Sequence, residues 1–486
     1  MKRGKKLIAL CGVLVVLVAA YAVTRTLTAE PEEDGGVSVA ALDGETLTGL
    51  SWTADGETLS LVKEGDSWSY EGDSSFPLDA GVPERMLAAL ADVTASRAID
   101  SPEALSEYGL DEPALTITAA AEDGTQTTFA LGDLNEMTDE YYLLCNGDES
   151  RLYLVDSTLY DAFHLGLYDM VEMELLPDFG TVVSLDIDQP GGSLSLRYVE
   201  DSADLYFNSG YHWFLERDGA QLALDTSSVS SLYGNVTGLS WLSCAAYHVS
   251  EEDLAGYGLD DGSAVVVTLT YELTETVETG ETDEEGNPVT EERTTTYPFV
   301  LRIGDGTEEG AYAMLNGSDM VYLIDTETAD ALRYASYASL RPSALCDMDW
   351  DTVNRLEVTA GGVDTAISFD IQEVETTDEN GETVTETAPL YTADGAELDS
   401  DAVEAVLDAI ADLTITGQAS GGAGTGTALA QFTFHREGEA LSRLALALYE
   451  YDAGSCLASF HGEDGLLVER SAVDSLLDLL DTALAD

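Results

Sequence analysis

Two Gly-Asp-Ser triplets, which begin at Gly65 and Gly72, are the residues of this sequence that look most like a hydrolase nucleophile motif. A nucleophilic serine needs a base, most often a histidine, within hydrogen-bond reach. The Gly-x-Ser-x-Gly turn that exposes the serine of many hydrolases does not occur in the sequence. The first triplet also lies in a predicted strand of an internal repeat, shortly before the helix that recurs in each copy of the repeat. We therefore interpret both triplets as structural, and the sequence predicts no catalytic residue.

A glycine-rich run, Gly421 to Gly426, resembles a loop that binds phosphate. Such a loop needs a helix directly after the glycines, because the N–H groups of the first helical turn face the phosphate. Here the pattern Phe432-Thr433-Phe434 predicts a strand, and no Gly-Lys-Ser or Gly-Lys-Thr follows. The run is therefore predicted to be a loop, and no cofactor is expected.

Two acidic segments, Glu275–Arg293 and Glu373–Glu386, contain the oxygen ligands that calcium prefers. Neither has the Asp-x-Asp-x-Asp-Gly spacing of a calcium loop. Each has an acidic-Gly turn between Thr-rich runs, which predicts a protruding hairpin with a hydrated tip. No metal ligand is therefore predicted, and calcium binding stays the alternative.

The 23 tyrosines and five tryptophans are the last group that could do binding chemistry, since aromatic rings stack on sugar faces. Trp68 and Trp213, however, occupy equivalent positions in a repeat, as do Tyr108 and Tyr257. This equivalence favours a role in the core over a glycan-binding platform.

The elements that would position these residues are set by an internal repeat. Leu78-Asp79, Leu224-Asp225 and Leu398-Asp399 each begin a helical pattern with apolar residues 7, 8, 11 and 14 positions after the aspartate. This spacing places the apolar residues on one helical face, and aspartate is a favoured residue for the helix N-cap. The apolar residues are Met86, Leu87, Leu90, Val93, Leu232, Tyr233, Val236, Leu239, Val406, Leu407, Ile410 and Leu413.

The first two copies share more than this helix. Tyr-Gly-Leu-Asp at 108–111 recurs at 257–260, and the Asn-Gly dipeptides that begin at Asn146 and Asn316 predict hairpin turns. The third copy is degenerate, because the glycine-rich run replaces Tyr-Gly-Leu-Asp and His461-Gly462 replaces Asn-Gly. A second helical pattern follows the return strand in every copy.

These patterns predict an α+β fold of three tandem repeat modules, each a mostly antiparallel sheet with two helices, behind one N-terminal transmembrane helix. The predicted parts are a basic start at 1–6, a transmembrane signal-anchor at 7–24, a linker at 25–45, modules at 46–176 and 177–342, and a degenerate third module at 343–486.

The charge balance excludes two classes of partner. The chain has 93 acidic and 19 basic residues and a net charge of −74. Nucleic-acid binding needs clustered basic residues that neutralise phosphates, and docking on anionic lipid surfaces needs them too. We therefore expect no nucleic-acid partner, and we attribute the acidity to solvated surface.

The start of the chain predicts an exported, membrane-held protein. Four basic residues between Lys2 and Lys6 precede an apolar run from Leu7 to Val23, and acidic residues follow it. This asymmetry places the start inside the cell and the bulk of the chain outside. The run is long enough for a short membrane span, but Ala20-Tyr21-Ala22 would also serve as a cleavage site. A single-pass anchor is the leading interpretation, and secretion after cleavage is the alternative.

The cysteines predict neither zinc nor redox chemistry, because no Cys-x-x-Cys is present. Cys145 and Cys456 lie at equivalent places in separate copies and are not expected to pair. The exported cysteines, Cys145, Cys244, Cys346 and Cys456, are predicted to be buried free thiols.

The Leu-Asp helix, the Tyr-Gly-Leu-Asp loop and the return strands of the type Val321-Tyr322-Leu323-Ile324-Asp325 resemble the bacterial domain of unknown function 4340 family. The resemblance implies a membrane-anchored, envelope-facing protein, and some relatives are encoded beside ABC-transport and gliding-type auxiliary proteins. The family offers no catalytic residue to carry over.

Two functional hypotheses follow. The first is a non-enzymatic extracytoplasmic scaffold or accessory protein of a bacterial envelope or membrane assembly, with a membrane-protein complex of the ABC-transport type as its partner. The second is a protein that binds an envelope glycan or another small envelope ligand.

Overall fold

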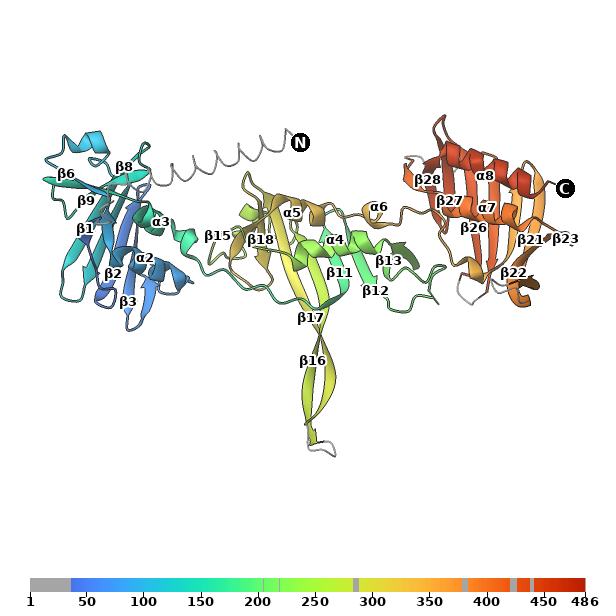
Figure 1. Ribbon diagram of the computed structural model, residues 1–486, viewed down its shortest axis with the longest axis horizontal. Helices are drawn as coiled ribbons and strands as arrows, with labels where there is room; N and C mark the ends of the chain where they lie inside the picture. The colour runs from blue at the N-terminus through green and yellow to red at the C-terminus, as the bar shows by residue number, and fades with distance from the viewer. Residues whose placement is uncertain are drawn as a thin grey trace, which may run out of the picture. The chain divides into compact units, whose positions relative to one another are not determined.

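The computed structural model describes residues 36–203, 205–217, 219–282, 288–377, 383–419, 426–437 and 441–485. The chain divides into two compact units, Met1–Leu175 and Leu176–Asp486, and each unit is described by itself (Figure 1). The five boundaries between the six parts predicted from the sequence are not tested by this division and stay predictions.

The first unit is built on an eight-stranded antiparallel sheet in the order β4-β3-β2-β7-β8-β9-β10-β6. A separate two-stranded sheet pairs β1 with β5. Two α-helices, α2 (Gly81–Ala91) and α3 (Thr158–Phe163), pack against each other. The strands are β1 Val37–Ala40, β2 Leu47–Ala54, β3 Glu57–Glu64, β4 Ser67–Tyr70, β5 Val93–Ala95, β6 Arg97–Asp100, β7 Leu115–Ala121, β8 Gln126–Asn135, β9 Glu140–Cys145 and β10 Arg151–Val155.

The second unit contains two nine-stranded antiparallel sheets. The first has the order β14-β13-β12-β11-β16-β17-β18-β19-β15. Its strands are β11 Thr181–Gln189, β12 Gly192–Tyr198, β13 Trp213–Arg217, β14 Ala220–Leu224, β15 Ser243–Ala246, β16 Val265–Thr282, β17 Pro288–Gly306, β18 Ala311–Leu315 and β19 Val321–Ile324, and its helices are α4 Thr226–Thr237, α5 Thr326–Arg333 and α6 Tyr337–Leu340.

The other nine-stranded sheet has the order β23-β22-β21-β20-β25-β26-β27-β28-β24. Its strands are β20 Val353–Ala360, β21 Val363–Thr377, β22 Thr383–Ala393, β23 Ala396–Glu397, β24 Ile415–Gln418, β25 Ala430–Arg436, β26 Arg443–Glu450, β27 Ser455–Phe460 and β28 Glu463–Glu469, and its helices are α7 Ser400–Ala411 and α8 Arg470–Ala483.

All three large sheets share one strand order. A meander of three or four strands is followed by a helix, and the chain then crosses to the far edge of the sheet. A second meander of four strands fills the space between, so that β2 pairs with β7, β11 with β16 and β20 with β25. The sequence repeat is therefore a repeat of topology.

The repeated helices bury the apolar face that their spacing predicts. In α7, Val403, Val406, Leu407 and Ile410 are at most 7% exposed. The helices α7 and α8 lie across one face of their sheet, and α4 and α5 do the same in the neighbouring sheet (Figure 1). Burial of each such side chain stabilises the fold by roughly 1.5–3 kcal/mol.

The aspartate N-caps are confirmed in two of the three copies. The carboxylate of Asp225 accepts a hydrogen bond from the Ser228 N–H at 2.8 Å, and that of Asp399 accepts one from the Ala402 N–H at 3.1 Å. In the first copy the helix begins one residue later, with Ala80 as the N-cap, and Asp79 accepts from the Gly81 N–H at 2.8 Å. Gly81 and Pro83 follow Asp79, and the first turn shifts by one residue.

The predicted fold class is wrong. Strands make up 47% of the structure and helices 19%, so the protein is mostly β-sheet. The described residues form four sheets and seven α-helices, and the first sheet of the second unit carries three helices instead of two. Periodicity did not predict α6, because a single helical turn is too short to show a period.

The predicted transmembrane helix is not part of the structure described here. Among the residues that the structure describes, no helix is both long and apolar enough to cross a membrane. The predicted signal-anchor at 7–24 lies outside those residues.

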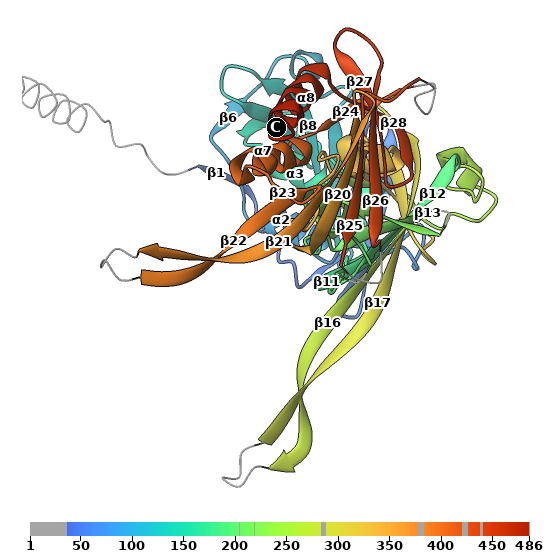
Figure 2. The ribbon, with the colours of Figure 1, turned by 90° about the vertical axis from the view of Figure 1, so that its right-hand side faces the viewer.

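Both acidic segments form protruding hairpins, as predicted. Beyond Glu272, β16 pairs within the described residues only with β17, from Leu273 opposite Thr295 to Thr282 opposite Pro288. We call residues 273–282 and 288–295 the long ribbon. It projects far from its sheet, and β21 and β22 form a shorter one (Figure 2). The tips at 283–287 and 378–382 lie outside the described residues.

Candidate functional site

The Gly-Asp-Ser triplets occupy turns and a strand, as the sequence interpretation predicts. Gly65 has a φ of +66° in the turn before β4, and Ser67 is the first residue of that strand. Asp73 accepts hydrogen bonds from the backbone N–H and the hydroxyl of Ser75, which closes a local turn. Asp73 therefore stabilises the backbone turn of the second triplet.

The Tyr-Gly-Leu-Asp segments form two equivalent loops. Each loop begins with a 3-10 turn, Leu105–Tyr108 or Leu254–Tyr257. The turn ends at the glycine of the motif, which has a φ of +67° in both loops. Tyr108 packs edge-on against Tyr142 with ring centroids 4.9 Å apart, and Tyr257 packs against Tyr312 at 5.0 Å. Both loops cover small apolar clusters, so their aromatic residues have the packing role that the repeat predicts.

A polar pocket of about 500 Å³ lies beside the second loop. Its cation is Arg302, which donates to Asp261 at 2.8 Å and to the Leu259 carbonyl at 3.2 Å. The sequence contained a signal for this charged residue. Arg302 interrupts an apolar strand pattern in the second copy, whereas the first copy has the uninterrupted run Phe-Ala-Leu-Gly. The arginine is already paired with a carboxylate. Ser318 also lines the pocket, and its hydroxyl oxygen accepts a hydrogen bond from the Met320 N–H at 2.9 Å. The described residues contain no group of three or more His, Cys, Asp or Glu arranged to hold a metal ion.

The four cysteines that the structure describes are free, as predicted. Cys145 lies in β9 and Cys456 in β27, which are equivalent strands of their sheets. Cys244, Cys346 and Cys456 are at most 4% exposed, whereas Cys145 is partly exposed. Burial raises the pKa of each thiol, most strongly that of Cys346. A raised thiol pKa disfavours the reactive thiolate.

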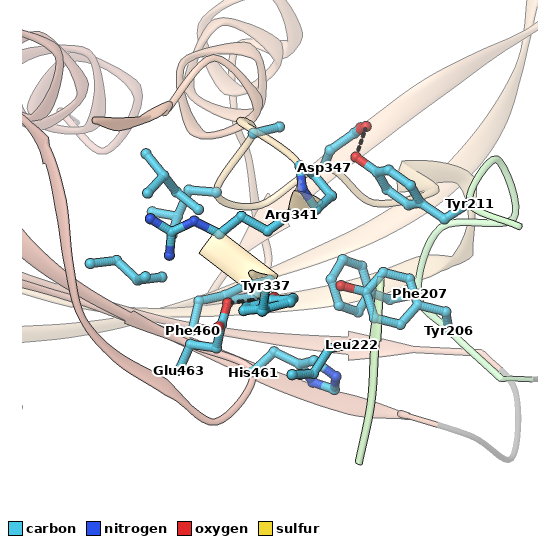
Figure 3. Close-up of a pocket in the computed structure, with 15 residues that line it drawn as sticks. Tyr206, Phe207, Tyr211, Leu222, Tyr337, Arg341, Asp347, Phe460, His461 and Glu463 are labelled. Atoms are coloured by element: carbon cyan, nitrogen blue, oxygen red, sulfur yellow. Dashed lines mark hydrogen bonds between the residues drawn. The ribbon is translucent and has the colours of Figure 1, made fainter. Parts of the chain in front are cut away.

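An aromatic joint lies between the two nine-stranded sheets of the second unit. Between β12 and β13 the chain leaves its sheet, and Phe207 reaches the core of the next one, where it is 3% exposed. Its ring centroid lies 5.3 Å from those of Phe460 and His461. Figure 3 shows Tyr206 and Phe207 from this excursion near Phe460 and His461 at the end of β27.

Hydrogen bonds hold the joint from both sides. The Ser209 N–H donates to the Asp349 carboxylate at 2.9 Å, and the Asp349 N–H donates to the Phe207 carbonyl at 3.0 Å. The Tyr337 hydroxyl in α6 donates to Glu463 in β28 at 3.0 Å (Figure 3). The short helix α6 thus supplies a contact between the sheets.

Burial changes the titration of the joint. It raises the pKa of Tyr206 strongly and, together with the neighbouring Asp347 carboxylate, raises the pKa of Tyr211 to about 12. Burial also lowers the pKa of His461, which favours the neutral imidazole within the aromatic cluster. These groups are therefore uncharged at neutral pH.

The joint has almost no free volume. Its cavity is about 30 Å³, which is enough for one or two water molecules and too small for a metabolite. The sequence did not predict this site, because the excursion and its neighbours in β27 and β28 are more than 200 residues apart and belong to no repeated motif. Its arrangement fits a structural joint.

Comparison with known proteins identifies the family. The model of the family described as "Domain of unknown function (DUF4340)" matches residues 68–260 and 213–431. Both matches begin at a tryptophan, Trp68 or Trp213, that precedes a Leu-Asp helix. No curated protein and no solved structure matches the chain. The two overlapping matches cover most of the sequence, indicate a duplication within it and confirm the resemblance seen in its motifs, so the chain belongs to the DUF4340 family.

Proposed function

We propose that the protein is a non-enzymatic extracytoplasmic scaffold or accessory protein of a bacterial membrane assembly, held to the membrane by residues 7–24. The observation that carries the proposal is the long ribbon. A two-stranded ribbon is marginally stable by itself. Its extra length therefore adds little to the stability of the sheet from which it projects, and the sheet does not explain that length.

The edges of the ribbon suit it to contact other chains. A strand edge without a neighbour presents a row of backbone donors and acceptors that can pair with an added strand. Glu275, Glu278, Glu291 and Glu292 are exposed on the long ribbon, and charge of this kind prevents indiscriminate edge pairing. The ribbon is therefore suited to a partner with a complementary basic strand or surface.

The location of the protein rests on its sequence. The basic residues before the apolar run and the acidic residues after it favour a single-pass anchor with the bulk of the chain outside the membrane. Secretion after cleavage near Ala22 is the alternative.

Co-purification of the full chain from a detergent extract of its native membrane tests the proposal. In the test variant, residues 274–294 are replaced by Asn-Gly, which closes the hairpin between Leu273 and Thr295. The matched control shortens the ribbon of β21 and β22 in the same way. We expect the full chain and the control to retain one membrane-protein partner and the test variant to lose it at unchanged Tm. If no membrane protein co-purifies with the full chain, the proposal fails.

The second candidate function is binding of an envelope glycan or another small envelope ligand. A groove beside α4 favours it, and its ligand class is argued in the next subsection. This candidate does not depend on the scaffold role.

A further inference from the structure

The helix α4 departs from the charge pattern of its counterparts. Its sequence, Thr-Ser-Ser-Val-Ser-Ser-Leu-Tyr-Gly-Asn-Val-Thr, has no charged residue. The equivalent helices α2 and α7 contain Glu84 and Arg85, and Asp401, Glu404 and Asp408, respectively. Because 23% of the chain is charged, a 12-residue helix would be expected to carry two or three charges. The surface of α4 instead consists of hydroxyl and amide groups.

A groove of about 380 Å³ runs between α4 and the sheet. This volume lies within the range of small-molecule sites, roughly 300–1,000 Å³. The lining has no charged residue, although the chain has a net charge of −74. It consists of aromatic and hydroxyl-bearing side chains with one glycine and one valine: Phe179, Gly180, Thr181, Val182, Tyr198, Trp213, Thr226, Ser230, Tyr233 and Thr237.

The aromatic residues of the groove form a supported wall. Tyr198 in β12 is paired in register with Trp213 in β13, and their ring centroids are 5.7 Å apart. Trp213 is 3% exposed and lies 5.9 Å from the ring of Tyr233 in α4. Tyr198 is 39% exposed. The buried tryptophan therefore holds a tyrosine whose surface is available to a ligand.

Hydroxyl groups from the helix complete the lining. Ser230 and Tyr233 are one helical turn apart on the same side of α4, and the Tyr233 hydroxyl donates to the Ser230 oxygen at 3.2 Å. Thr226 and Thr237 line the groove from the two ends of the same helix. Each hydroxyl can both donate and accept hydrogen bonds.

We infer that this groove binds a neutral oligosaccharide. Sugar rings offer C–H faces to aromatic rings and hydroxyl groups that both donate and accept hydrogen bonds, and the lining supplies partners for each. An anionic polymer would find no counter-charge in the groove and would be repelled by the whole chain. A second copy of the chain would be repelled for the same reason. The inference is independent of the scaffold role and names the ligand class and the site of the second candidate function.

Isothermal titration of the full chain with uncharged tetrasaccharides tests the inference. Chitotetraose, cellotetraose and maltotetraose serve as probes, and polygalacturonate serves as the acidic counterpart. We expect saturable binding of at least one neutral probe and none of the acidic polymer. Tyr198→Ala should weaken binding about 5- to 150-fold, which is the effect of removing one base-stacking aromatic ring from a nucleic-acid groove.

Two matched variants separate the groove from general effects. Tyr198→Phe keeps the ring and should retain binding within about twofold. Tyr334→Ala removes a tyrosine that is 71% exposed outside the groove and should leave binding unchanged. If none of the neutral probes binds, or if Tyr198→Ala with an unchanged Tm binds as tightly as the unmodified chain, the inference is wrong. Neither result affects the membrane co-purification that tests the scaffold role.

Discussion

Gly304 lies directly under the backbone carbonyl of Tyr257, so closely that a Cβ at position 304 would overlap with the Tyr257 oxygen. The same relationship joins Gly132 to Tyr108 in the first unit. In both places, a Tyr-Gly-Leu-Asp loop packs on the second strand after it in the chain, β8 or β17. The close contact thus explains why the Tyr-Gly-Leu-Asp loop and a strand that contains a glycine, Gly132 or Gly304, occur together in both copies.

Gly304→Ala should destabilise the second unit, because the new methyl group must displace a backbone carbonyl and not a movable side chain. Overpacking of this kind costs about 1–3 kcal/mol. The control is Gly306→Ala in the same strand, where a Cβ would meet no atom within 4 Å. Urea denaturation of the two variants should show a lower midpoint for Gly304→Ala alone. Equal midpoints would contradict the close approach.

Asp225→Ala should lower stability by about 1 kcal/mol, the usual cost of losing an N-cap. The carboxylate accepts from the Ser228 N–H and from the hydroxyls of Ser227 and Ser228. These bonds also lower the pKa of Asp225. Asp225→Asn retains a capping oxygen and is the control. Thermal denaturation should place the asparagine variant close to the unmodified protein, and a larger loss in asparagine than in alanine would argue against capping.

The aromatic joint should weaken in mild acid. Burial lowers the pKa of His461 below its ordinary value of 6.5 in the folded chain, so the unfolded chain binds a proton first as the pH falls. Stability from His461 is therefore complete above about pH 6.5 and declines as the pH falls through the folded pKa.

His461→Phe keeps an aromatic ring and removes the titration. Urea midpoints measured from pH 7.5 to 5.0 should fall less for this variant than for the unmodified chain. The difference between the two series isolates His461 from the other histidines. Parallel series would show that His461 is not held neutral by burial.

The cysteines should react with iodoacetamide in the order of their exposure. Of the four cysteines that the structure describes, Cys145 is partly exposed and should be alkylated first, whereas Cys346 is fully buried and has the most strongly raised pKa. Peptide mass spectrometry after timed quenching measures the order. Early labelling of Cys346, at a rate similar to that of Cys145, would mean that its sheet opens readily.

The sequence predicted the parts of this fold that depend on local chemistry. Aspartate caps, Asn-Gly turns and helical faces act over fewer than ten residues, and each leaves a period or a dipeptide in the chain. The turn glycines Gly147 and Gly317 have positive φ, as those dipeptides require. Repetition of these signals is also what made the duplication visible before the structure.

Other features depend on residues far apart in the sequence. Phe207 contributes to a core whose other buried residues begin at Leu345, 138 residues further along the chain (345 − 207), and no local pattern marks it. The balance of helix and strand was also misjudged, since each of the three large sheets has eight or nine strands. The sequence contains one signal of the neutral groove beside α4, which is a helix without charged residues in an acidic chain. This signal indicates a binding groove only when the structure places Tyr198 and Trp213 beside the helix.

Photocross-linking from the long ribbon in living cells tests the proposed scaffold role most directly. A photoreactive amino acid replaces Glu278 or Glu291, which lie on neighbouring strands, and Tyr334 serves as an exposed control outside the ribbon. We expect one membrane-protein adduct of the same mass from both ribbon positions and none from position 334. Absence of an adduct from both ribbon positions, or an equal yield from position 334, would contradict it.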